Sequence, residues 1–396
     1  MAAKTTVEIL NSSLSKIAEI KSLYPITKSG MVLRYSRELS DYGSALFRVS
    51  TKDTVLSQFG DILQPHKYHV RIKRGGVTVW QGAIIDNPAR NKNYVEVKAV
   101  EYLYYLSKVL IRRDADNPTT SDDESNFKVF SSGTLSSAVQ TLFQNAITDL
   151  GTNHILGASK GNAQVGTIEN PDYPSNFLDS TGQPLRGAWN FSTDLTIQFD
   201  YHSALYVIKQ FGIYSKADFE MTNSLAFNFK KLIGQRITGL TFTYNRVGTN
   251  IVDYNFPRLG QRMANDLIGI ATDDKGNVLH ATKTNSDSIN LIGRLQDARA
   301  YTDVKNQNLL DGRMAEELRL TVDPEESPIT IVLDENAYPL GQFSLGDILW
   351  VKVKDHVIDY EKERRIVGYT VNVHNTGREL TYVQTNQPDP KLLGSS

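Results

Sequence analysis

The chain has 396 residues, of which 40% are hydrophobic and 22% are charged, values typical of a globular rather than a disordered protein. Its length fits roughly two to four compact units, and its formal net charge of −1 argues against a surface built to neutralise the phosphates of nucleic acid. Because the chain has no cysteine, disulfides, thiolate metal sites and cysteine nucleophiles are excluded.

No apolar run approaches the ~20 residues that span a bilayer, and the segment Met1–Thr5 lacks the apolar core of a secretion signal. We therefore expect a protein that is made in a cytoplasm and does not insert into a membrane.

The first part of the chain is predicted to form antiparallel strands. A possible strand at Val7–Leu10 is followed by two paired strands, Met31–Tyr35 and Ala45–Val49, around the turn Asp41–Ser44. From residue 68, apolar and polar residues alternate with the period of two that a half-buried strand requires.

The stretch from residue 68 to residue 106 continues that pattern. Gly75 and Gly76 follow the first strand where the chain must reverse, because only glycine takes positive φ without steric cost. Two further strands and a short helix are predicted at Val77–Ile85, Val95–Ala99 and Leu103–Leu110. This succession is typical of an antiparallel unit that closes into a barrel, and we assign residues 1–112 to it.

Residues 113–200 differ in character and are predicted to be an inserted helix and loop domain. Thr134 can cap a helix that carries apolar residues at helical spacing up to Ile147. The segment 151–187 is rich in Gly, Asn, Ser and Pro, which favours a long functional or partner-ordered loop.

Residues 201–324 are predicted to be an α+β middle domain, with helices at Asp200–Phe211, ended by Gly212, and within Thr302–Leu320. The hairpin 218–230 has a strongly apolar face and is a candidate to pack with the C-terminal unit. Further strands are expected at Ile237–Tyr244, Leu267–Thr272 and Val278–Thr282. The turn Asp273–Asn277 has the start of a calcium-loop pattern, but Thr282 replaces the closing acidic residue, which favours a plain hairpin turn.

The C-terminal region, residues 325–390, is predicted to be a second tube-like β-barrel. After a strand through Ile329, Ile331 and Leu333, three strands are expected at Ile348–Val353, Arg365–Val373 and Glu379–Val383. Gly82-Ala83-Ile84 and Gly368-Tyr369-Thr370 occupy matching places in the two middle strands. The match indicates an internal duplication, although any two three-stranded meanders look alike.

The common local signatures of catalysis and cofactor binding are missing. No nucleophile elbow, phosphate loop or dinucleotide fingerprint occurs, and no histidine pair has the spacing of a zinc site. His66 and His69 are three residues apart, which on a strand would point them to opposite faces. We therefore predict no enzyme activity, no catalytic or metal-binding residues and no cofactor.

The order of these features resembles the baseplate hub, or tail-tip hub, proteins of tailed bacteriophages, including the N-terminal hub part of tail-associated lysins. The resemblance is carried by residues 41–47, 80–84, 95–99, 345–348 and 365–369. Its motif residues, to which we assign structural roles, are Trp80, Gly82, Gly346, Asp347, Arg365 and Gly368.

The resemblance implies a mainly β fold with short helices (α+β), in which two tube-like antiparallel β-barrel domains flank inserted α+β domains. It also implies a homotrimer whose six barrels adapt a sixfold tail tube to a threefold tail tip in the virion. The implied partners are the tail tube or distal tail ring, the tape-measure protein, and a separate spike, fibre or lysin protein. DNA would pass through the lumen in transit only.

Two other functions stay open at this stage. A distal tail or receptor-binding protein would use the segment 151–187 as its binding domain. A virion-associated polysaccharide hydrolase would use carboxylates that the fold brings together, such as Asp194, Asp200 or Asp218.

Overall fold

The structure is a computed structural model. It describes residues 4–59, 63–111, 127–130, 132–157, 163–173, 186–191, 197–200, 202–245, 249–257, 263–273, 275–302, 304–322, 328–334 and 341–388. Asp194 lies outside these residues. Mainly antiparallel strands with short helices make up the described chain, which confirms the predicted mainly β, α+β class.

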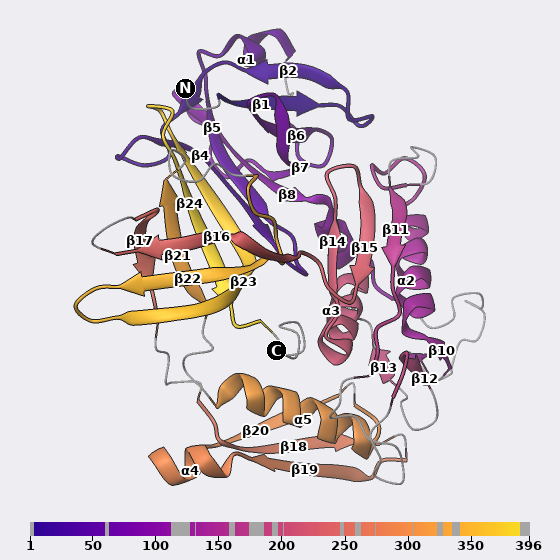
Figure 1. Ribbon diagram of the computed structural model, residues 1–396. Helices are drawn as coiled ribbons and strands as arrows, with labels where there is room; N and C mark the ends of the chain where they lie inside the picture. Colours follow the sequence, from indigo (N-terminus) through magenta and orange to yellow (C-terminus); the bar gives the residue numbers. More distant parts are fainter. Residues whose placement is uncertain are drawn as a thin grey trace.

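The N-terminal β unit lies at the top of Figure 1 and contains two hairpins and a meander. Its elements are β1 (Thr5–Leu10), β2 (Lys16–Ile20), β3 (Leu23–Tyr24), β4 (Met31–Glu38), β5 (Ser44–Ser50), α1 (Thr54–Phe59), β6 (His69–Arg74), β7 (Val77–Asp86), β8 (Tyr94–Glu101) and the 3₁₀ helix η1 (Tyr102–Lys108). The predicted turn between β6 and β7 has both glycines at positive φ, 55° at Gly75 and 86° at Gly76.

The consecutive strands β2 and β3 bring the two ends of this unit close together. β2 pairs with β1, whereas β3 pairs with β5. The segment 16–24 therefore spans the gap between the first strand and the rest of the unit, although the path of strand pairing stays open at β2.

The C-terminal β unit lies beside it (Figure 1) and also contains a three-stranded meander. Its strands are β16 (Arg236–Tyr244), β17 (Ile251–Asn255), β21 (Ile329–Asp334), β22 (Ile348–Lys354), β23 (Asp359–His374) and β24 (Glu379–Asn386). The long strand β23 pairs with β22 near its start and with β24 near its end.

The two β units are parts of one sheet rather than separate sheets. β23 pairs antiparallel with β4, in a register that runs from Gly368 opposite Glu38 to His374 opposite Met31. The buried apolar side chains of both units form one continuous core, which includes Phe47, Trp80, Val351 and Val371. The relative position of the two units is thus set by hydrogen-bonded strands.

The middle of the chain packs against η1 as a second core. Its elements are β9 (Phe127–Phe130), β10 (Gly133–Thr134), α2 (Leu135–Asp149), β11 (Gln164–Ile168), β12 (Asn190–Phe191), β13 (Ile197–Asp200), α3 (Ala204–Ser215), β14 (Asp218–Met221) and β15 (Ala226–Lys230). Thr134 caps α2 as predicted, since its hydroxyl accepts a hydrogen bond from the Ser137 N–H.

A small sheet at the bottom of Figure 1 completes the fold. It consists of β18 (Asp266–Thr272), β19 (Val278–Thr284) and β20 (Gln296–Tyr301), with the helices α4 (Ser286–Ile292) and α5 (Gln307–Thr321). The predicted turn Asp273–Asn277 joins β18 to β19, and the Asp273 carboxylate accepts hydrogen bonds from the Lys275 and Asn277 N–H groups.

Three local predictions need correction. The helix expected at Leu103–Leu110 is a 3₁₀ helix that ends at Lys108, and Leu110 is exposed. The helix expected at Asp200–Phe211 begins only at Ala204, because Asp200 ends the strand β13 and Ser203 caps the helix, and it continues to Ser215, because Lys216 takes the left-handed conformation that ends it. Part of the segment predicted as an irregular loop, Gln164–Ile168, is the strand β11.

Candidate functional site: the junctions that hold the two β units

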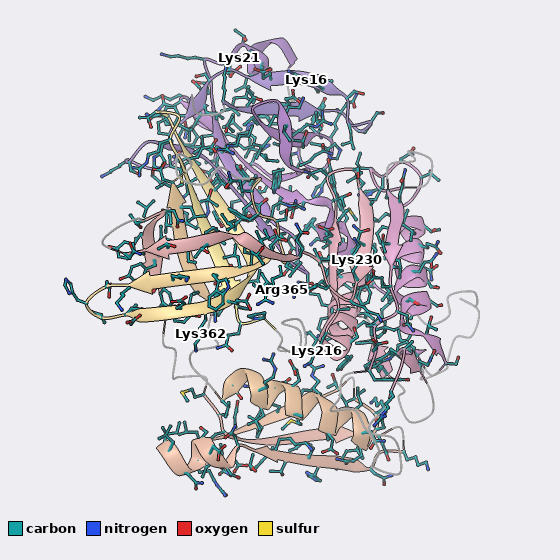
Figure 2. All side chains as sticks on the ribbon, in the orientation of Figure 1. Lys16, Lys21, Lys216, Lys230, Lys362 and Arg365 are labelled. Atoms are coloured by element: carbon teal, nitrogen blue, oxygen red, sulfur yellow. The ribbon has the colours of Figure 1, made fainter. Side chains whose placement is uncertain are left out.

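Arg365 on β23 forms the centre of the first junction. Its guanidinium makes a bidentate ion pair with the Asp218 carboxylate at the start of β14, with Nη1 3.2 Å from Oδ1 and Nη2 bonded to Oδ2. It also donates to the carbonyl oxygens of Ile233, at 2.9 Å, and Gly346, at 3.1 Å. One side chain thus joins three parts of the chain, and Figure 2 labels it where the C-terminal unit meets β14 and β15.

The turn Gly346-Asp347 completes this junction. A Cβ on Gly346 would lie 1.9 Å from the Ile233 carbonyl oxygen, and the residue has φ of 83°, so both backbone contact and conformation require glycine. The buried Asp347 carboxylate accepts hydrogen bonds from the N–H groups of Gln235, at 2.9 Å, and Ser344, at 2.6 Å. The turn therefore fixes the segment that enters β16.

Trp80 and Gly82 belong to a second junction, inside the N-terminal unit. Trp80 is fully buried, and its Nε1–H donates to the Ser36 carbonyl oxygen of β4 at 3.0 Å. A Cβ on Gly82 would lie 2.1 Å from the Val100 carbonyl oxygen and 2.6 Å from the Trp80 ring. Glycine therefore lets β7 lie close to the backbone of β8 and leaves room for the Trp80 ring of the same strand.

A buried ion pair lies beside this junction. Arg37 Nε donates to Glu101 Oε1 at 2.8 Å, and the Gly43 N–H donates to Oε2 at 2.7 Å. Burial raises the pKa of Glu101, while the Arg37 guanidinium and the Gly43 N–H oppose that shift. The pair links β4, at the residue next to Ser36, to the end of β8.

Gly368, the sixth predicted residue, lies on β23, the strand of the C-terminal unit that pairs with β4 of the N-terminal unit. The pairing of β23 with β24 shifts register between Ile366 and Gly368, and Gly368 is opposite both Glu38 and Gln384. The structure thus brings Gly346, Asp347 and Arg365 together at one junction, and places Trp80 and Gly82 at another.

Sequence reasoning missed the partners of these residues. Asp218 was considered only as a hydrolase carboxylate, and the buried pair of Arg74 with Glu379, at 2.7 Å, was not anticipated. The Glu379 carboxylate also accepts a hydrogen bond from the Thr5 hydroxyl. Each of these pairs joins segments far apart in sequence, so local spacing carries no signal for it.

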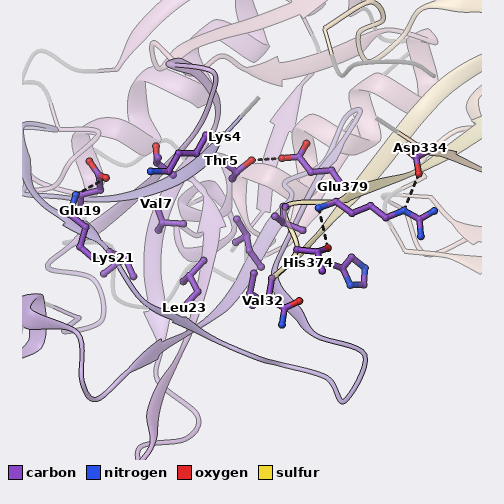
Figure 3. A pocket seen from close by; sticks show the side chains of 18 residues that line it. Lys4, Thr5, Val7, Glu19, Lys21, Leu23, Val32, Asp334, His374 and Glu379 are labelled. Carbon is purple, nitrogen blue, oxygen red and sulfur yellow. Dashed lines mark hydrogen bonds and ion pairs between the residues drawn. The ribbon is translucent and has the colours of Figure 1, made fainter. Parts of the chain in front are cut away.

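A cavity of about 860 Å³ lies between the two β units and has Glu379 in its wall (Figure 3). Its lining combines Lys21 and Glu19, 2.8 Å apart, with Arg378 and Asp334, 3.0 Å apart. Each of the three carboxylates that line it is ion-paired with a lysine or an arginine.

A second cavity, of about 730 Å³, lies beside the first junction. Ile233, Leu345 and Tyr369 line it together with side chains of β6, β7, β14 and β15.

Three histidines meet around two tyrosines of η1. His66 Nδ1 lies 3.4 Å from the Tyr105 hydroxyl, the His154 ring lies 4.2 Å from the Tyr105 ring, and the His69 ring lies 5.5 Å from the Tyr102 ring. The expectation that His66 and His69 face opposite sides of a strand was wrong, because β6 begins at His69 and His66 precedes it at positive φ.

Burial, with a contribution from His154, lowers the pKa of His69 to about 4. Burial also lowers the pKa of His154 to about 4, with a contribution from His66. Both rings are therefore neutral near pH 7.

Two classes of feature are absent from the part of the chain that the structure describes. No group of three histidine, cysteine, aspartate or glutamate side chains could hold a metal ion. None of the helices has the length and apolar character needed to cross a bilayer.

The fold of this chain is similar to that of tail proteins whose structures are solved. The 43 kDa tail protein of prophage MuSo2 from Shewanella oneidensis superposes with a TM-score of 0.57 and 12% identity, over 97% of this chain and 99% of that chain. The tail protein from Neisseria meningitidis MC58 gives a TM-score of 0.56 and 10% identity, over 97% and 96% of the two chains. Prophage tail protein gp18 from Listeria monocytogenes EGD-e gives 0.50 and 13%, over 98% and 97%.

No protein-family model matches the sequence, and no curated protein matches it. The resemblance to phage tail proteins noted from the sequence is confirmed at the level of the fold.

Proposed function

We propose that this protein is a structural hub of a phage tail tip, located in the virion. The observation that carries the proposal is the shared fold, which extends over almost the whole length of this chain and of the prophage tail proteins. The hub would be a homotrimer that adapts a sixfold tail tube to a threefold tip. Three copies of two similar β units supply the six positions that such an adaptor needs.

The similarity of the two β units supports this proposal. β7 is the middle strand of the meander β6–β7–β8, and β23 is the middle strand of β22–β23–β24. The matching residues Gly82 and Gly368 lie in these middle strands, and each strand has a register shift within two residues of its matching segment. We keep the proposed division into β units at 1–112 and 325–390, an insertion at 113–200 and a middle domain at 201–324, with β16 and β17 of the middle range pairing with strands of the C-terminal unit.

The role proposed is structural rather than enzymatic. Asp218, the one hydrolase candidate whose side-chain contacts are described, is bound to Arg365 and to the Ile233 N–H. The proposed partners are the tail tube or distal tail ring, the tape-measure protein and a spike, fibre or lysin protein. DNA would cross the trimer lumen without stable binding, as the net charge of −1 favours.

The test is to delete the gene from its phage and to examine particles by electron microscopy. We expect heads with absent or tip-less tails, and full tails when the wild-type gene is supplied in trans. Normal infectious tails in the deletion strain, or host glycan hydrolysis by the purified protein, would refute the proposal.

A further inference from the structure

The small sheet β19–β18–β20 has one covered face and one open face. α5 packs on the covered face, where Gly269 lies so close to Met314 that a Cβ would be 2.6 Å from its sulfur. On its other side α5 contacts α3, since Arg313 donates to Gln210 and Tyr214. In Figure 1, α5 therefore lies between the sheet and the rest of the molecule, and the opposite face points away.

The residues of the open face follow from the strand register. Bridge partners point to the same side of a sheet, so residues paired with Ile268 and Ile270 share their face. The face consists of Asp266, Ile268, Ile270, Thr272, Val278, His280, Thr282, Thr284, Gln296, Ala298 and Ala300. All of them are exposed except Ile268, which is half-buried, and Asp266, which is buried.

Charge is divided between the two faces. Two ion pairs of this unit, Lys283 with Asp311 and Arg299 with Glu317, lie on the α5 side, whereas Arg294 pairs with the buried Asp266 at the end of the sheet next to α4. Apart from Asp266, which is buried at one end of it, the open face contains no lysine, arginine, aspartate or glutamate. A flat, exposed face of β-branched and small residues without charge fits an uncharged protein surface, and fits neither nucleic acid nor anionic lipid.

The helix α4, at one end of the same sheet, provides a surface of that kind. None of its residues is buried, and Leu291 and Ile292 are 84% and 48% exposed. Its single charged residue is Asp287 in the first turn. Hydrogen bonds rather than packing hold it, because Asn285 caps its first turn and Asn265 donates to Ser288 Oγ and to the Gly293 carbonyl oxygen.

We propose that α4 of one copy packs on the open sheet face of the next copy, with Leu291 and Ile292 against Ile270. The inference rests on the proposed homo-oligomer and assigns a surface to it. Because the two complementary surfaces lie on different parts of one chain, the contact is heterologous and runs from copy to copy until a ring closes.

The first experiment measures the oligomeric state of the full chain by sedimentation velocity over a concentration series. Ile270→Lys changes the sheet face, Leu291→Lys changes α4, and the matched control Val357→Lys changes a residue that is 90% exposed at the β22–β23 turn. We expect each interface variant to weaken association by about tenfold or more, since each buries an unpaired charge in the contact, and the control to behave as wild type.

The second experiment mixes the two interface variants. The Ile270→Lys chain keeps an intact α4 and the Leu291→Lys chain keeps an intact sheet face, so the mixture should form a dimer that neither variant forms alone. Since the wild-type chain contains no cysteine, a chain carrying Leu291→Cys and Ala298→Cys should also form intermolecular disulfides without background.

A monomeric wild-type chain at every concentration, unchanged association of both variants, or no dimer in the mixture would overturn this inference. The proposed function is tested separately and fails if deletion of the gene leaves normal tails. If both variants associate as wild type while the deletion abolishes tails, α4 is not in the interface and the hub proposal stands.

Discussion

Replacement of Gly346 by alanine tests the first junction most directly. The new Cβ would lie 1.9 Å from the Ile233 carbonyl oxygen, so the backbone must shift, and φ of 83° adds conformational strain. The strain costs about 1 kcal/mol and the forced shift about 1–3 kcal/mol. The shift would also displace Asp347 and the Arg365 guanidinium, so we expect a total loss of roughly 3 kcal/mol in the free energy of unfolding.

The matched control is Gly377→Ala. Gly377 has φ of 82°, but a Cβ there would meet no atom within 4 Å, so only the strain of about 1 kcal/mol applies. Urea unfolding followed by far-ultraviolet circular dichroism measures both variants, and the slope of free energy against urea reports whether the transition stays cooperative. Equal losses in the two variants would refute the close approach at Gly346, because conformation alone would then explain both.

Three further predictions concern buried charge, pH and a helix cap. Asp218→Asn leaves the Arg365 guanidinium without its counter-ion and should cost about 3 kcal/mol in the free energy of unfolding, whereas Asp359→Asn, in an exposed pair with Lys354, should leave the urea midpoint unchanged within error. The pKa of His69 is lowered from 6.5 to about 4, so stability present above pH 6.5 should be lost as pH falls toward 4, by up to about 3 kcal/mol. Urea midpoints at several pH values should show a weaker dependence on pH for His69→Gln than for the wild-type chain, and an equal dependence would refute this reasoning. Thr134→Ala removes the cap of α2 and should cost about 1 kcal/mol in thermal unfolding, while a change within error would show that the cap adds nothing.

Local pattern was enough to predict most strands of both β units. The strands β6, β14 and β15 were predicted from the alternation of apolar residues, and the turn after β6 was predicted from its glycine pair. These signals depend only on neighbours in the sequence, and the structure contains all four elements. The helices α2 and α5 were also predicted, because their buried leucines recur at helical spacing.

Elements whose stability comes from distant partners were missed. β17 pairs with β21, although the residues of the small sheet separate the two strands in the sequence. The strand β11 pairs in parallel with β15. The pairing of β4 with β23 joins segments more than three hundred residues apart, which no local period reveals. α4 was missed for another reason, since a helix that buries none of its residues shows no apolar period.

Gly212 shows how a residue type can mislead. Glycine after an apolar helical run usually ends the helix, but here α3 continues through it. A Cβ at Gly212 would lie 3.0 Å from the Ala217 carbonyl oxygen and 3.7 Å from the Phe219 ring. The glycine thus allows the chain after α3 to fold back closely against the helix, a requirement set by tertiary packing.

The shared strand pair has a mechanical consequence for the proposed adaptor. Two similar units occupy alternate positions of a six-membered ring only if each chain holds them at one fixed angle, and a flexible linker would not do so. The ladder between β4 and β23 meets this need, because changing the angle would break backbone hydrogen bonds and expose the core common to both units. Arg365 and Trp80 reinforce the same geometry, the first by tying β23 to the middle of the chain and the second by tying β7 to β4. The motif residues can therefore serve assembly without touching any partner.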